Sequence, residues 1–84
     1  MNDLQGRVVI VAHADTDDGA ALARVVCGAG ASAVLTGGEF HTLGALAAEL
    51  HEGTGAAIAV FAGDLSQDVE RRELASMVGE LFPN

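Results

Sequence analysis

The sequence has few of the residues that nucleic-acid-binding proteins rely on. It contains no lysine, tyrosine or tryptophan, and four arginines stand against twelve acidic residues, which gives a net charge of −8. Such an acidic chain repels nucleic acids and anionic membranes. It can form neither an extended basic patch nor an aromatic stacking surface. We therefore expect no nucleic-acid partner and no membrane partner.

Cysteine and long apolar runs are also scarce. The single cysteine, Cys27, excludes a disulfide within the chain, and in its Ala/Val-rich surroundings it is expected to be a small buried residue. The longest apolar run, the seven residues 56–62, is far shorter than the roughly 20 residues that span a membrane. The polar segment 1–7 contains an acid and does not resemble a secretory signal. These features predict a cytoplasmic protein.

Half of the residues are hydrophobic. Along the chain, short apolar runs alternate with longer amphipathic segments. The runs at 8–12, 31–36 and 56–62 predict strands, and their continuous apolar character is typical of a parallel sheet that is buried on both faces. The segments 17–28 and 39–52 predict helices, with the stripe of the second at spacing i, i+3, i+4, i+7.

A third helix is predicted at the C-terminal end, after a cap at Ser66. Its apolar side would consist of Val69, Leu74, Met77, Val78 and Leu81. The order βαβαβα with short connections predicts one α/β domain over residues 1–84. We expect its three strands to form one parallel sheet.

Several segments, in this order, resemble the first half of a short-chain dehydrogenase/reductase. "VVIVAHADTDDGAALA" resembles the family's first strand, its Thr-Gly-x-x-x-Gly-x-Gly turn and its first helix. "GAGASAVLTGG" resembles the corner and second strand, and "VFAGDLSQDVE" the third strand and following turn. The resemblance covers roughly residues 4–82. It implies a three-layer Rossmann-like half-fold, βαβαβα, whose three-stranded parallel sheet has the order 3-2-1. It also implies NAD or NADP as cofactor and oxidoreductase activity.

The glycine motif of this family is degenerate here. Laid on it, Ala12 takes the Thr place, His13 the first Gly and Asp17 the second, and only Gly19, the third, is retained. The first two glycines allow the tight turn and the approach of the pyrophosphate, whereas the third allows the helix to pack on the strand. The packing glycine is therefore kept, and the two ligand-facing glycines are replaced by larger side chains.

Acidic side chains add a charge penalty to this steric one. Asp15, Asp17 and Asp18 lie where a pyrophosphate would bind, and each would repel it. One such pair at ~4 Å costs about 1 kcal/mol in water and about 4 kcal/mol at an effective dielectric constant near 20. We therefore expect no resident cofactor, although NAD or NADP stays open as an alternative.

The resemblance implies a set of cofactor-binding candidates. Gly38 lies where an acidic residue would favour NAD and an arginine NADP, while neighbouring Glu39 is better explained as a first-turn helix acid. Asp64 matches the family's adenine-contacting aspartate, and a turn residue explains it equally well. The full set is His13, Asp17, Asp18, Gly19, Gly38 and Asp64.

The same loop could instead hold a hard metal ion. His13, Asp15, Asp17 and Asp18 offer one imidazole and three carboxylates, which suits Mg²⁺ or Mn²⁺. The spacing matches no calcium loop. Solvated carboxylates, with Asp17 or Asp18 as the helix cap, are the alternative, and no metal is expected.

The family's acid–base catalysis cannot be built from these residues. Its Tyr-x-x-x-Lys motif lies beyond the segments matched here, and the sequence has no tyrosine and no lysine. The chain is expected not to be an enzyme on its own. Three function classes remain: a non-catalytic Rossmann-like module, the NAD(P)-binding half of a split reductase, and a metal or small-ligand binder using residues 13–18.

The first strand is central in the full sheet, which has the order 3-2-1-4-5-6. In this chain it becomes an edge, and an apolar edge without proline is prone to pair. The expected first and second helices share one face, which leaves the third to cover the other. We expect a homodimer of order 3-2-1-1′-2′-3′, joined through Val8, Val9, Ile10 and Val11, or a separate chain that supplies the missing half.

Overall fold

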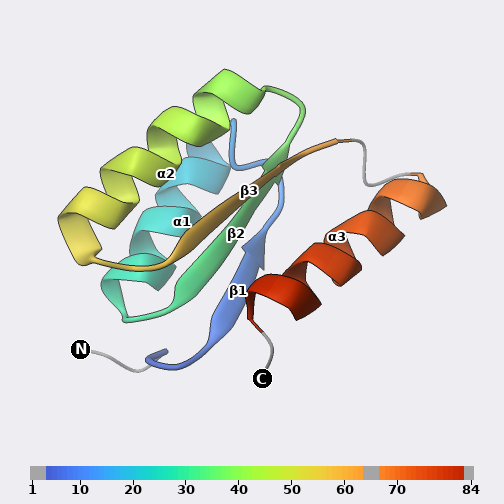
Figure 1. Cartoon of the computed structure of the whole chain (residues 1–84). Helices are drawn as coiled ribbons and strands as arrows, with labels where there is room; N and C mark the ends of the chain where they lie inside the picture. The colour runs from blue at the N-terminus through green and yellow to red at the C-terminus, as the bar shows by residue number, and fades with distance from the viewer. Residues whose placement is uncertain (1–3, 64–66, 83–84) are drawn as a thin grey trace.

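A computed structural model describes residues 4–63 and 67–82 of the chain. The elements are β1 (Val8–Val11), α1 (Asp17–Gly28), β2 (Ser32–Gly37), α2 (Phe40–Thr54), β3 (Ile58–Ala62) and α3 (Asp68–Leu81). The strands form one parallel sheet in the order β1-β2-β3 (Figure 1). This is the expected order 3-2-1 read from the opposite edge, so the predicted βαβαβα half-fold is confirmed.

The boundaries differ from the predicted ones by one or two residues at most element ends. Helix α1 spans the predicted 17–28, whereas α2 continues to Thr54 and ends at Gly55, whose φ of 73° suits a glycine C-cap. Helix α3 begins at Asp68 with Gln67 as N-cap, so the predicted cap at Ser66 is wrong by one residue. Ser66 itself lies outside the described residues.

The main core lies between the sheet and the helices α1 and α2, which share one face (Figure 1). Alternate strand residues point into it, as the two-residue period of a strand requires. Helix α2 contributes Leu43, Leu46 and Leu50, at the spacing read from the sequence. Cys27 of α1 is 2% exposed, as expected, and burial raises the pKa of its thiol.

Helix α3 covers the opposite face incompletely (Figure 1). Only Leu74 is buried among its described residues, while Val69 and Leu81 are exposed. These two members of the predicted apolar side are therefore not covered by the sheet. The physical reason is length: 14 helical residues extend ~21 Å, and strands of four to six residues only ~13–20 Å, so the helix ends overhang the sheet.

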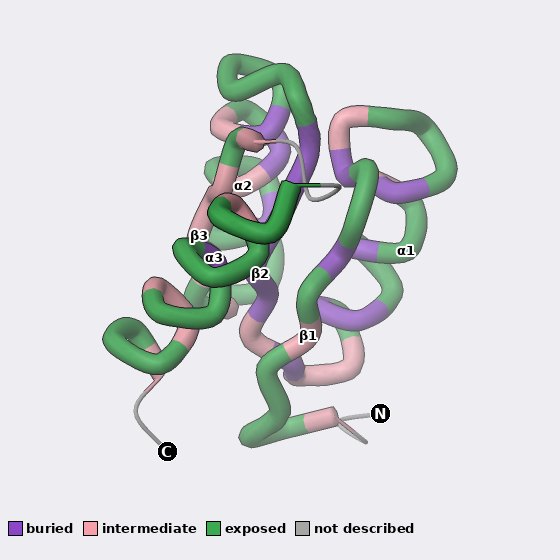
Figure 2. Tube along the Cα trace, turned by 90° about the vertical axis from the view of Figure 1, so that its right-hand side faces the viewer, coloured by how far each residue is buried: buried purple, intermediate pink, exposed green. Residues whose placement is uncertain are grey.

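The strands differ strongly in burial. Figure 2 shows β2 mostly buried and β1 mostly exposed, and Val8 and Ile10 on β1 are 38% and 48% exposed. Both point to the α3 face, because their neighbours Val9 and Val11 pack on the main core. Within the described residues, no helix combines the length and the apolar character that crossing a membrane requires.

Candidate functional site

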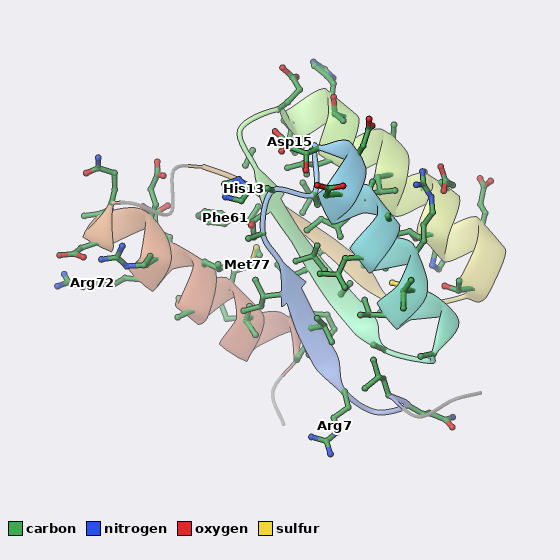
Figure 3. All side chains as sticks on the ribbon, turned by 180° about the vertical axis from the view of Figure 1, so that it is seen from behind. Arg7, His13, Asp15, Phe61, Arg72 and Met77 are labelled. Carbon is green, nitrogen blue, oxygen red and sulfur yellow. The ribbon has the colours of Figure 1, made fainter. Side chains whose placement is uncertain are left out.

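The candidate site lies where β1 and β2 end and the loops to α1 and α2 begin. In open α/β sheets, ligands bind at the carboxyl ends of the strands. Figure 3 shows His13 and Asp15 at this end of the molecule and Arg7 at the other end of β1. The structure thus brings together the loop 12–16, the first turn of α1 and the glycines at the end of β2.

His13 has a φ of 54°, in the left-handed region that glycine adopts freely. It is the residue that takes the place of the first motif glycine, so the turn keeps the glycine conformation although the residue has changed. Such a conformation costs an L-residue roughly 1–2 kcal/mol. The His13 side chain is exposed.

Thr16 is the N-cap of α1, which corrects the prediction that Asp17 or Asp18 caps it. Its Oγ1 accepts a hydrogen bond from the Gly19 N–H at 3.2 Å and donates one to the His13 carbonyl at 2.6 Å. Thr16 has the extended backbone that a cap needs, whereas Asp17 and Asp18 already lie in the helix. Their carboxylates are therefore exposed in the first turn.

Gly19 packs directly against the turn. A Cβ at this position would lie 2.0 Å from the His13 carbonyl oxygen, a distance no side chain tolerates. The third glycine of the motif therefore keeps its packing role.

Asp15 connects the two loops of the site. Its Oδ2 accepts hydrogen bonds from the backbone N–H groups of Gly38 and Glu39, both at 3.1 Å. A Cβ on Gly37 would lie 2.7 Å from the Asp15 carboxyl carbon, so only glycine leaves room for this carboxylate. Sequence reasoning missed this contact, although the Gly37–Gly38 pair was a signal that something approaches the chain closely there.

The other candidates are less engaged. Gly38 is exposed, and its N–H is used by Asp15. Glu39 is the N-cap of α2 and makes no capping bond with its side chain, so it precedes the helix instead of lying in its first turn. Asp64 lies outside the described residues.

The structure does not assemble the proposed metal ligands. Among residues 4–63 and 67–82, no three His, Cys, Asp or Glu side chains are grouped as metal ligands would be. His13, Asp15, Asp17 and Asp18, the weak candidates for Mg²⁺ or Mn²⁺, do not converge, because the Asp15 carboxylate turns to β2 and binds main-chain donors.

A shallow cavity of about 270 Å³ lies between α1 and α2, beside the loop 12–16. Arg24 and Glu49 line it and form an ion pair, with Nε and Oε2 2.8 Å apart. This hydrogen bond raises the pKa of Arg24 and lowers the pKa of Glu49. The pair leaves the arginine engaged by a carboxylate, so it is not presented to an anion in the loop.

A dinucleotide diphosphate fits this arrangement poorly. Three carboxylates surround the first turn of α1, and two N–H donors at the end of β2 are already bonded to Asp15. A Rossmann fold holds the pyrophosphate at the first turn and the ribose near the end of the second strand. Asp15 joins these two places, so the residues present do not match NAD or NADP.

Comparison with known proteins places the fold. No family model and no curated protein matches the sequence. Among solved structures, a protein of Pseudomonas syringae classed as a short-chain dehydrogenase is 30% identical over 99% of this chain and 34% of its own, with a TM-score of 0.87. An oxidoreductase of E. coli is 25% identical over 99% of this chain and 35% of its own, with a TM-score of 0.88.

L-Sorbose reductase of Gluconobacter frateurii, solved with NADPH and L-sorbose, has a TM-score of 0.89 at 22% identity and covers 95% of this chain. The chain spans about a third of the length of each of these proteins. In fold it is therefore similar to about a third of a short-chain dehydrogenase, as an N-terminal fragment with the Rossmann βαβαβα unit that the sequence resemblance implied would be.

Proposed function

We propose that this chain is a non-catalytic Rossmann-like module that acts by binding polypeptide rather than NAD or NADP. The observation that carries the proposal is the Asp15 bridge. Its carboxylate is bonded to the Gly38 and Glu39 N–H groups, and it lies between the loops that hold the cofactor in a Rossmann fold. These two N–H groups could bind an anion, but they are already hydrogen-bonded to Asp15. The Asp15 carboxylate also adds a negative charge at this position.

The surrounding charges support the same conclusion. Asp17 and Asp18 add two exposed carboxylates at the helix N-terminus, where a diphosphate would otherwise find free N–H groups. Two repulsive contacts of the size given above lower affinity by a factor of roughly 10² or more. The exposed apolar strand β1, by contrast, offers a surface suited to another polypeptide.

A second candidate is the NAD(P)-binding half of a reductase. The fold supports it, as does the conformation of the turn: His13 keeps the positive φ of the first glycine, and Gly19 keeps its packing role. In this candidate another two-thirds of a reductase fold supplies catalysis.

Isothermal titration calorimetry with NAD⁺ and NADP⁺ separates the two candidates. We expect no heat of binding at millimolar dinucleotide for the wild-type chain, and measurable binding once Asp15→Ala and Asp17→Gly are combined. The control is Glu52→Ala with Glu73→Ala, which changes the net charge equally at exposed sites away from the loop. Micromolar binding by the wild-type chain would overturn the proposal in favour of the second candidate.

A further inference from the structure

We infer that the polypeptide partner is a second copy of this chain, paired through β1 in an antiparallel register centred on Val9. This inference rests on the proposed polypeptide-binding role and identifies its partner and geometry. The starting observation is that β1 lies at the edge of the sheet with Val8 and Ile10 exposed, whereas every residue of the opposite edge strand β3 except Ala62 is at least partly buried.

The main chain of β1 is arranged to accept a further strand. The Ser32 N–H donates to the Arg7 carbonyl at 2.9 Å, which places Arg7, and hence Val9 and Val11, on the side bonded to β2. The N–H and C=O groups of Val8 and Ile10 therefore face outward from the sheet. In a strand the same two residues also share one face, so an added strand meets their free main-chain groups and their exposed side chains together.

Twofold symmetry limits the register. A twofold axis perpendicular to the sheet keeps each face on its own side, so opposed residues must both be odd or both be even. With Val9 opposite Val9 of the second copy, Val8 of each copy faces Ile10 of the other. Both residues lie inside β1, and they form hydrogen-bonded pairs between the two strands. A centre at Ile10 would instead pair Val8 with Ala12, which lies beyond the end of β1. The Val9 register therefore uses the whole available edge.

Charge complementarity favours antiparallel pairing of two copies over parallel pairing. No acidic residue occurs between positions 4 and 14, so the paired edges do not repel each other despite the net charge of −8. Arg7 is exposed at the start of β1, and Figure 3 shows its side chain pointing away from the molecule, at the opposite end from Asp15. Antiparallel pairing brings this arginine to the acidic end of the second copy.

Arg7 and the acidic turn of the second copy also lie on the same face of the paired sheet. Arg7 shares the parity of Val9 and Val11, which point to the side of α1, and the exposed carboxylates of Asp17 and Asp18 open that helix. Each dimer therefore contains two attractions between arginine and the acidic turn, related by the axis. A parallel partner of the same sequence would place arginine beside arginine.

Disulfide trapping tests the register directly. In a Cys27→Ala background, Val9→Cys is expected to form a disulfide-linked dimer on mild oxidation, because Cα atoms of opposed non-hydrogen-bonded residues lie ~4.5 Å apart. Val8→Cys is the matched control: its copies are offset by two positions, roughly 8 Å apart, too far for a disulfide. Cross-linking at Ile10→Cys instead of Val9→Cys would overturn the register.

Proline tests the main-chain pairing. Because the Ile10 N–H faces outward, Ile10→Pro leaves the bonds to β2 intact but removes one donor per copy from the interface. We expect a roughly 30-fold or greater weakening of the dimer by light scattering and sedimentation, while Ile10→Ala, which keeps the donor, weakens it less. Arg7→Glu should weaken the dimer, and adding Asp18→Arg should restore it.

The failures of the two proposals are distinguishable. A wild-type chain that is folded and monomeric at high micromolar concentration, or an Ile10→Pro dimer as tight as the wild type, overturns the homodimer. The polypeptide-binding role is then still supported if the titrations detect no binding of NAD⁺ or NADP⁺. Binding of either dinucleotide overturns that role whatever the mass of the particle.

Discussion

Strand β1 (VVIV) is entirely apolar and β2 (SAVLTG) only in part, yet β2 is the more deeply buried of the two. In β2 every residue from Ala33 to Gly37 is buried, whereas in β1 only Val11 is. The difference comes from position: β2 has a strand on each side and a layer on each face, while β1 has one neighbouring strand and an incomplete cover from α3. An apolar run thus reports the environment for which a strand is suited, and β1 is suited to the interior of a wider sheet.

The largest expected effect comes from truncating the interior strand. Leu35→Ala removes a side chain with no exposed surface and should lower the free energy of unfolding by about 2–5 kcal/mol. Ile10→Ala on β1, in dilute protein where any dimer has dissociated, should cost less than about 1 kcal/mol. Urea unfolding followed by circular dichroism measures both. Equal losses would show that β1 is as well packed as β2.

The junction of β1 with α1 gives the next effect. Gly19→Ala forces a methyl group against the His13 carbonyl and should cost about 1–3 kcal/mol or more, as overpacking does. Gly44→Ala in α2 is the control, since nothing lies within 4 Å of the added methyl group, and it should gain about 0.5–1 kcal/mol from helix propensity. The same unfolding assay compares them; a tolerated Gly19→Ala would contradict the packing role.

The smallest effect on stability is expected from the ion pair between α1 and α2. Glu49→Gln removes the ion pair with Arg24, and exposed pairs contribute little, so Tm at neutral pH should fall only slightly. Because the pKa of Glu49 is lowered in the folded state, its contribution is present above the ordinary glutamate pKa and is lost as pH falls through the folded value. The difference in Tm between variant and wild type should vanish in acid. A difference that persists there would contradict this origin.

Much of the fold was predictable because it depends on local patterns. The helix at 17–28 and the three strands follow from apolar patterns and from the glycines at or near the ends of α1, β2, α2 and β3. The order of the strands in the sheet follows from the family resemblance. The Thr16 cap was missed because three capping residue types follow one another at positions 16–18, and only backbone conformation selects among them. Periodicity identified the apolar side of α3 but could not show that the sheet is too short to cover it.

The candidate site was predictable only in part. Placing His13 on the first motif glycine gave the position that has a positive φ, although the sequence does not show that the conformation survives the substitution. The Asp15 bridge joins residues 23 and 24 positions apart, and no local pattern encodes such a contact. The site therefore depends on how two loops meet, which is a property of the folded chain.

The buried thiol of Cys27 gives this protein a built-in reporter of core opening. It is the sole cysteine in the sequence and lies in α1 where that helix meets the sheet. Because this side chain is only 2% exposed, a thiol reagent reaches it when its surroundings open, and its labelling rate records how often they do, with no substitution needed. Comparing this rate at low and high protein concentration would tell whether events at the distant sheet edge steady the interior.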